Sequence, residues 1–70
     1  MNYAAKLEEY KKLIGILSKE EALTLAAEAD DFLGQLGPFD PAWAFFQRQR
    51  NAMFQYAELL EWEENAGNVN

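Results

Sequence analysis

The chain has 70 residues, no cysteine, no histidine and a net charge of −6 at pH 7. A chain of this length forms one small domain, which buries only ~60% of the surface that its unfolded state exposes. The missing residue types remove disulfides, thiolate metal sites and the commonest general base. We therefore expect no enzyme, no cofactor and no metal site, and stability must come from helix packing and oligomerisation.

The acidic balance also restricts the partners. Twelve acidic residues stand against six basic ones, whereas nucleic acids and anionic membranes both select a basic patch. No apolar run approaches the ~20 residues of a transmembrane helix, and the N-terminus lacks the pattern of a signal peptide. We expect a cytoplasmic protein that binds another protein, and neither a nucleic acid nor a membrane.

The first helical segment is predicted at Tyr3–Leu17. Its apolar residues recur at helical spacing, and the stripe consists of Leu7, Tyr10, Ile14 and Leu17. Ser18 and Glu21 then match a capping box, in which each side chain bonds the backbone amide of the other residue. This pattern predicts that a second helix starts after Ser18.

The second helix is predicted at Lys19–Leu36, with a stripe made of Ala22, Ala26, Ala29, Leu33 and Leu36. On ideal geometry this stripe is rotated by about a third of a turn from the first, so one straight helix cannot point both at a single core. Two separate helices explain the rotation, and one long kinked helix is the alternative. Gly15 and Gly34 lie inside these patterns and are interpreted as tolerated helix glycines. For Gly34 the alternative is an early end of the second helix, and for Gly15 the alternative is a close approach to the third helix.

The firm break in the chain is Gly37-Pro38-Phe39-Asp40-Pro41. Gly37 is expected in the left-handed conformation that ends many helices, and Pro38 prevents further helix. Asp40 is expected to cap a third helix, with Pro41 at its first position. This helix is predicted at Pro41–Glu64, and residues 65–70 are expected to fray.

The predicted fold is therefore all-α, with residues 1–64 as a single helical domain. Helices at about 3–17, 19–36 and 41–64 form either a small three-helix bundle or a kinked helical hairpin. No alternating run indicates a β-strand. The helical-hairpin layout is similar to that of many small bacterial and phage adaptor proteins, although no motif is specific enough to transfer a function.

The third helix has more apolar surface than one packing partner can cover. Its apolar arc spans roughly 220°, against the ~100° of an ordinary surface helix. A central stripe is assigned to the core: Phe46, Met53, Tyr56, Ala57 and Leu60. The flanking residues predict contact with a second copy or with a foreign protein, and the predicted protein-binding residues are Trp43, Phe45, Arg50, Phe54, Leu59 and Trp62.

Two of these residues carry a specific expectation. Arg50 falls inside the apolar arc, where its guanidinium must reach water or pair with an acid. The expected partners are Glu28 or Asp31 of the second helix, or an acid of a second subunit. Trp62 lies beside the polar stripe and is interpreted as an exposed anchor or as a cover for the tail.

The acidic residues gather in two regions, the second helix and the end of the third. The predicted acidic surface consists of Glu20, Glu21, Glu28, Asp30, Asp31, Glu58 and Glu61. Such patches either keep an apolar protein soluble or imitate the phosphates of DNA. The end of the third helix is an unfavourable place for acids because it is the negative end of the helix dipole.

The leading functional hypothesis is a stoichiometric protein-binding module, such as an inhibitor, an anti-activator or an adaptor. It is expected to be a homodimer, because pairing of third helices would bury one apolar flank. One alternative is a DNA mimic that occupies the basic groove of a nucleic-acid-binding protein. The other is an assembly chaperone or structural subunit.

Overall fold

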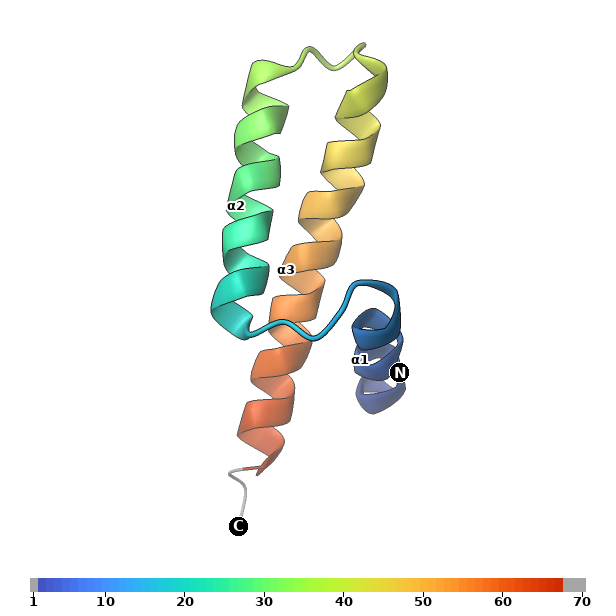
Figure 1. Ribbon diagram of the computed structural model, residues 1–70, viewed down its shortest axis with the longest axis vertical. Coiled ribbons are helices and arrows are strands. Elements are labelled where there is room, and N and C mark those ends of the chain that lie inside the picture. Colours follow the sequence, from blue (N-terminus) through green and yellow to red (C-terminus); the bar gives the residue numbers. More distant parts are fainter. Residues whose placement is uncertain (1, 68–70) are drawn as a thin grey trace.

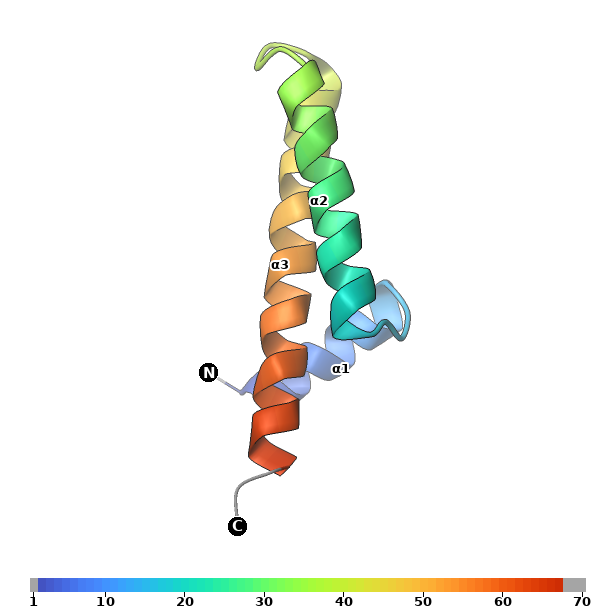
Figure 2. The same ribbon diagram turned by 90° about the vertical axis from the view of Figure 1, so that its left-hand side faces the viewer.

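The computed structural model describes residues 2–67, which form three helices in the order α1 (Tyr3–Leu13), α2 (Lys19–Gln35) and α3 (Pro41–Gly67). α2 and α3 form a long antiparallel hairpin, and α1 lies against the C-terminal half of α3 (Figure 1). Figure 2 shows that α1 crosses α3 rather than running alongside it. Residues 2–67 contain no strand, so the all-α prediction is confirmed.

The capping box predicted from the sequence starts α2. The amide of Glu21 donates to Ser18 Oγ at 3.1 Å, and the amide of Ser18 donates to Glu21 Oε1 at 3.0 Å. The hydrogen bond from the Ser18 amide, followed by that from the Ser18 side chain, favours the charged carboxylate and lowers the pKa of Glu21. α1 and α2 are therefore separate helices, and the kinked-helix alternative is wrong. Within residues 2–67, α1 comes close to α3 and not to α2.

The first helix ends at Leu13, four residues before the predicted Leu17. Gly15 adopts a φ of +118°, a conformation that glycine enters without the steric cost other residues incur. Its amide and that of Ile14 still bond the carbonyls of Lys11 and Tyr10, which closes the last turn. The positive φ of Gly15 therefore ends the helix. A Cβ at this position would meet no atom within 4 Å, so a close approach to α3 is not the reason for the glycine. Gly34 lies within α2 and is a tolerated helix glycine.

The α2–α3 turn follows the prediction at one end only. Asp40 Oδ1 accepts the amide of Ala42 at 2.9 Å, so Asp40 caps α3 as expected. Gly37 does not adopt the left-handed conformation predicted for it. α2 instead ends at Gln35, and the extended backbone of Leu36 (φ −90°, ψ 145°) already leads the chain out of the helix. The amide of Asp40 then closes the turn on the carbonyl of Gly37 at 3.0 Å.

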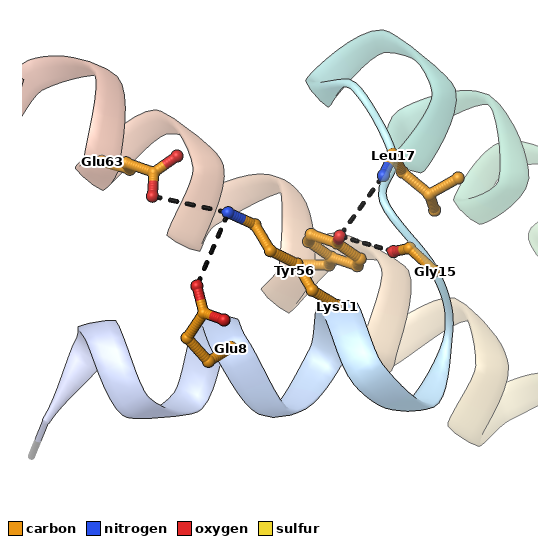
Figure 3. Close-up of polar contacts among 6 residues, drawn as sticks. All are labelled: Glu8, Lys11, Gly15, Leu17, Tyr56 and Glu63. Carbon is orange, nitrogen blue, oxygen red and sulfur yellow. Dashed lines mark hydrogen bonds and ion pairs between the residues drawn. The ribbon is translucent and has the colours of Figure 1, made fainter.

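α3 extends to Gly67, beyond the predicted end at Glu64. Residues 65–67 of the expected tail are therefore helical, and residues 68–70 lie outside the described part of the chain. Lys11 Nζ approaches Glu63 Oε2 at 3.6 Å and Glu8 Oε1 at 3.9 Å (Figure 3). The pair with Glu63 links the last turns of α3 to α1, whereas the pair with Glu8 lies within α1. None of the described helices is both long and apolar enough to cross a membrane.

The core consists of two contact layers on α3. The small side chains Ala22, Ala26 and Ala29, together with Leu33, form the buried side of α2, as the sequence predicted, and let α2 approach α3 closely. A second cluster joins α1 to α3, in which Leu7 packs with Tyr56 and Leu59. α3 is therefore the central helix, with α2 on one side of it and α1 on another.

Tyr56 fixes the position of the α1–α2 linker. Its side chain is fully buried, and its hydroxyl donates to the carbonyl of Gly15 at 2.7 Å and accepts the amide of Leu17 at 3.3 Å (Figure 3). The ring of Tyr10 stacks on that of Tyr56 with centroids 5.6 Å apart. The hydroxyl of Tyr10 donates to Gln55 Oε1. Burial, followed by the charge of Glu9, raises the pKa of Tyr10.

Candidate protein-docking surface

The residues predicted to bind a partner do not form one surface. Trp43, Arg50 and Phe54 follow one another at helical spacing on one flank of α3. Phe45 is nine residues from Phe54, which at 3.6 residues per turn places it about 180° away. These two exposed phenylalanines of α3 therefore face opposite directions, and a single partner surface cannot easily use both.

Leu59 was assigned to the binding surface, and that assignment is wrong. Its side chain is only 4% exposed and packs with Leu7 and Tyr56. The physical reason is that α1 covers this flank of α3. The sequence shows that the flank is apolar, but it does not show which part of the chain folds back onto it.

Arg50 pairs within the chain, although not with either acid expected from the sequence. Its Nη1 lies 3.0 Å from Asp30 Oδ1 of α2. Asp30 lies four residues after buried Ala26, at the edge of the face that α2 turns to α3. Glu28 and Asp31 are rotated away from this edge and point to solvent. The guanidinium is therefore already occupied by an intramolecular partner.

Trp62 is held by the first turn of α1. Its ring lies 5.4 Å from that of Tyr3, with the two planes tilted by 50°. Part of the indole remains accessible, but the contact ties α3 to α1 rather than covering the tail. The spacing of aromatic residues in α1 does not indicate that Tyr3 contacts Trp62.

A continuous apolar surface does exist, and Phe45 is at its centre. The ring of Phe46 stacks on that of Phe32 with centroids 4.9 Å apart and makes a T-shaped contact with that of Phe45 at 5.2 Å. Beside Phe45, the end of α1 and the face of α3 enclose an open groove of about 400 Å³. The groove is lined by Tyr10, Leu13, Ile14, Phe45, Arg48, Gln49 and Ala52. We define the phenylalanine surface as four apolar residues of the groove together with the two rings stacked beside Phe45: Leu13, Ile14, Phe45, Ala52, Phe46 and Phe32.

The phenylalanine surface is substantially open to solvent. Leu13 is 76% exposed, Phe45 55% and Phe32 49%, and Ile14 is also exposed. None of the residues that line the groove is acidic. The apolar stripe predicted for the first helix includes Ile14, which is exposed instead. Reading Gly15 as a helix stop would have placed Leu13 and Ile14 at an open helix end.

The chain has further exposed apolar side chains outside this surface. Phe39 is 97% exposed at the apex of the α2–α3 turn, between Pro38 and Asp40, and Ile16 projects from the α1–α2 linker. Neither residue was selected from the sequence. Phe39 was named only as a member of the Gly-Pro turn, and no other residue of such a turn can cover its ring.

The acidic residues are partly used inside the molecule. Asp30 pairs with Arg50, and Glu61 Oε1 lies 3.6 Å from Lys19 Nζ. Glu21 completes the capping box. The unfavourable placement of acids at the end of α3 is thus explained by ion pairs to α1 and α2. The other members of the predicted acidic surface are exposed: Glu20, Glu28, Asp31 and Glu58.

Among residues 2–67, no group of three or more metal-ligating side chains is close enough to hold an ion. In comparisons with protein-family models, with curated proteins and with solved structures, the chain has no match. The phenylalanine surface is therefore the feature from which a function is inferred.

Proposed function

We propose that this protein is a stoichiometric protein-binding module, of the inhibitor, anti-activator or adaptor kind, which acts in the cytoplasm without catalysis. The observation that supports the proposal is the pair Phe45 and Leu13, which are 55% and 76% exposed on either side of one open groove. Exposed apolar patches of a few hundred Å² often mark interaction sites.

The free energy available from this surface is of the same order as the roughly 4–15 kcal/mol that association costs. A fully exposed side chain of this size offers roughly 200 Å², so Leu13, Ile14, Phe32 and Phe45 together offer on the order of 400 Å². Burial at ~25 cal/mol per Å² gives about 10 kcal/mol before the entropic costs of association. Arg48 and Gln49 supply the polar rim that an apolar docking site requires.

The shape of the groove suggests how a partner is recognised. An apolar groove between two helices accepts the apolar face of a third helix, whose anchors recur at i, i+3, i+4 and i+7. Phe45, Arg48, Gln49 and Ala52 of α3 show this spacing themselves. We therefore expect the partner to present a helix.

The structure bears differently on the two other functions expected from the sequence. A DNA mimic would use the acidic surface, in which Asp30 and Glu61 already have basic partners within the chain. An assembly chaperone would use the same apolar surface as a binding module and differs only in the fate of the bound protein.

The experiment is capture of binding proteins by the immobilised chain, with a matched pair of variants. Phe45→Ala and Phe54→Ala remove the same side chain from the same helix at similar exposure, 55% and 44%, but on opposite flanks. We expect a protein held in a 1:1 ratio by the wild type and by Phe54→Ala to be lost with Phe45→Ala. Loss with Phe54→Ala and retention with Phe45→Ala would contradict the proposal.

A further inference from the structure

We propose that the protein bound by the phenylalanine surface is a second copy of this chain, placed by a two-fold axis that passes between Arg48 and Gln49 of α3. This inference rests on the proposed function, because it names the partner of the same surface. It follows from the spacing of residues along the open part of α3, from the shape of the groove and from the charges on it.

The open stripe of α3 is complementary to itself. Its members Phe45, Arg48, Gln49 and Ala52 are spaced symmetrically about the midpoint between positions 48 and 49. In an antiparallel two-fold pairing, Phe45 of each copy therefore lies opposite Ala52 of the other, the largest side chain against the smallest. Arg48 lies opposite Gln49, a cation against a neutral amide whose oxygen accepts hydrogen bonds.

The groove provides the cavity that this pairing requires. Ala52 leaves space at one end of the stripe, and Leu13 and Ile14 at the end of α1 form the wall beside it. Phe45 of one copy would insert over Ala52 of the second copy and against its Leu13. Such a reciprocal insertion is an isologous interface, in which the same patch serves both partners.

The length and area of the surface suit a crossed pair of helices. The distance along α3 from Phe45 to Ala52 is about 10 Å, or two helical turns. Helices that cross at about 50° contact each other over a short length of this kind. A stable interface buries about 800 Å² on each partner. The four exposed side chains supply on the order of half of that area, and Tyr10, Phe46 and the polar rim surround them.

The charge distribution permits two copies to approach through this surface. Each copy carries a net charge of −6, but none of the residues lining the groove is acidic, and Arg48 is basic. The acids Glu63 and Glu61 pair with α1 and α2 near the far end of α3. The lining of the groove itself therefore contributes no carboxylate to the contact.

The test uses single-cysteine variants, which is straightforward because the natural chain contains no cysteine. Gln49→Cys places a thiol beside the proposed axis, and Asn51→Cys places one about 200° around the helix on its exposed side. Under mild oxidation we expect Gln49→Cys to form a disulfide-linked dimer and Asn51→Cys to remain monomeric. A mixture of Phe45→Cys and Ala52→Cys should give the mixed disulfide in preference to either self-linked dimer.

Analytical sedimentation of the chain without introduced cysteines measures its oligomeric state and completes the test. We expect a dimer whose dissociation constant rises at least 10-fold in Phe45→Ala and stays within about 2-fold in Phe54→Ala. A monomer at every concentration, or cross-linking of Asn51→Cys as fast as Gln49→Cys, would overturn the inference. If the wild type is monomeric while Phe45→Ala loses a captured foreign protein, the inference fails and the proposed function stands. If the wild type dimerises as described and Phe45→Ala retains every foreign protein captured, the inference stands and the proposed binding of a foreign protein fails.

Discussion

Replacing Tyr56 by phenylalanine removes one oxygen atom from a buried residue that contacts both α1 and the α1–α2 linker. The ring stays in the cluster with Leu7 and Leu59, and its stacking on Tyr10 is retained. Only the hydroxyl is lost, and with it the hydrogen bonds to the Gly15 carbonyl and the Leu17 amide. The variant therefore tests the link between α3 and the α1–α2 linker without creating a large cavity.

The expected cost follows from the two backbone groups that lose their partner. A hydrogen bond contributes about 1 kcal/mol net, and a buried group left unpaired costs ~1–3 kcal/mol. Gly15 and Leu17 are only partly buried, so water can reach them and reduce this cost. We expect the free energy of unfolding to fall by about 2 kcal/mol, which corresponds to roughly 8–16 °C in Tm for a domain of this size.

The assay is urea denaturation at one protein concentration, combined with amide hydrogen exchange. Tyr3→Phe is the control, because the ring of Tyr3 contacts Trp62 and should keep that contact without its hydroxyl. We expect the control to change stability by less than ~0.5 kcal/mol. In Tyr56→Phe, the amide of Leu17 in the linker should also lose its protection before the amides of α2 do. A stability change below ~0.5 kcal/mol with Leu17 still protected would refute the reasoning.

Three further predictions concern the stability of the fold at Leu59, at Gly15 and Gly34, and at Glu21. Leu59→Ala should lower the free energy of unfolding by about 2–5 kcal/mol, because the side chain is buried; near-wild-type stability in denaturation would return Leu59 to the surface. Gly15→Ala should destabilise the fold by about 1–2 kcal/mol through its positive φ, whereas Gly34→Ala should raise stability by ~0.5–1 kcal/mol, and equal Tm shifts would contradict both. The lowered pKa of Glu21 means that its contribution is present above the carboxyl's ordinary pKa and lost as pH falls through the folded value. The stability advantage of the wild type over Glu21→Gln should therefore shrink on acidification, and a difference independent of pH would disprove it.

The features that the sequence predicted correctly are those encoded by neighbouring residues. The capping box at Ser18, the cap at Asp40 and the alanine stripe of α2 each depend on residues within one or two turns of each other. Their hydrogen bonds and helical spacing are set by local geometry, so they can be read without knowing the rest of the fold.

The errors concern contacts between distant segments. The sequence placed Leu59, Trp62 and Arg50 among the residues that bind another protein, whereas in the structure each contacts a residue of α1 or α2. No local pattern states where α1 folds back, because that position depends on the burial of Leu7 and on the bonds from Tyr56 to the linker. For the same reason the sequence distributed the binding residues over both flanks of α3, and only Phe45 belongs to the phenylalanine surface.

One face of α3 connects the fold with the proposed function. Phe45, Ala52, Tyr56 and Leu59 lie along this face, and α1 covers the last two while the first two line the open groove. Because α1 crosses α3 rather than running alongside it, the helix covers only a short stretch of this face (Figure 2). Gly15 ends α1 beside the uncovered stretch, where Leu13 and Ile14 line the groove. The direction in which α1 crosses α3 therefore determines how much of this face is left for the partner that we propose.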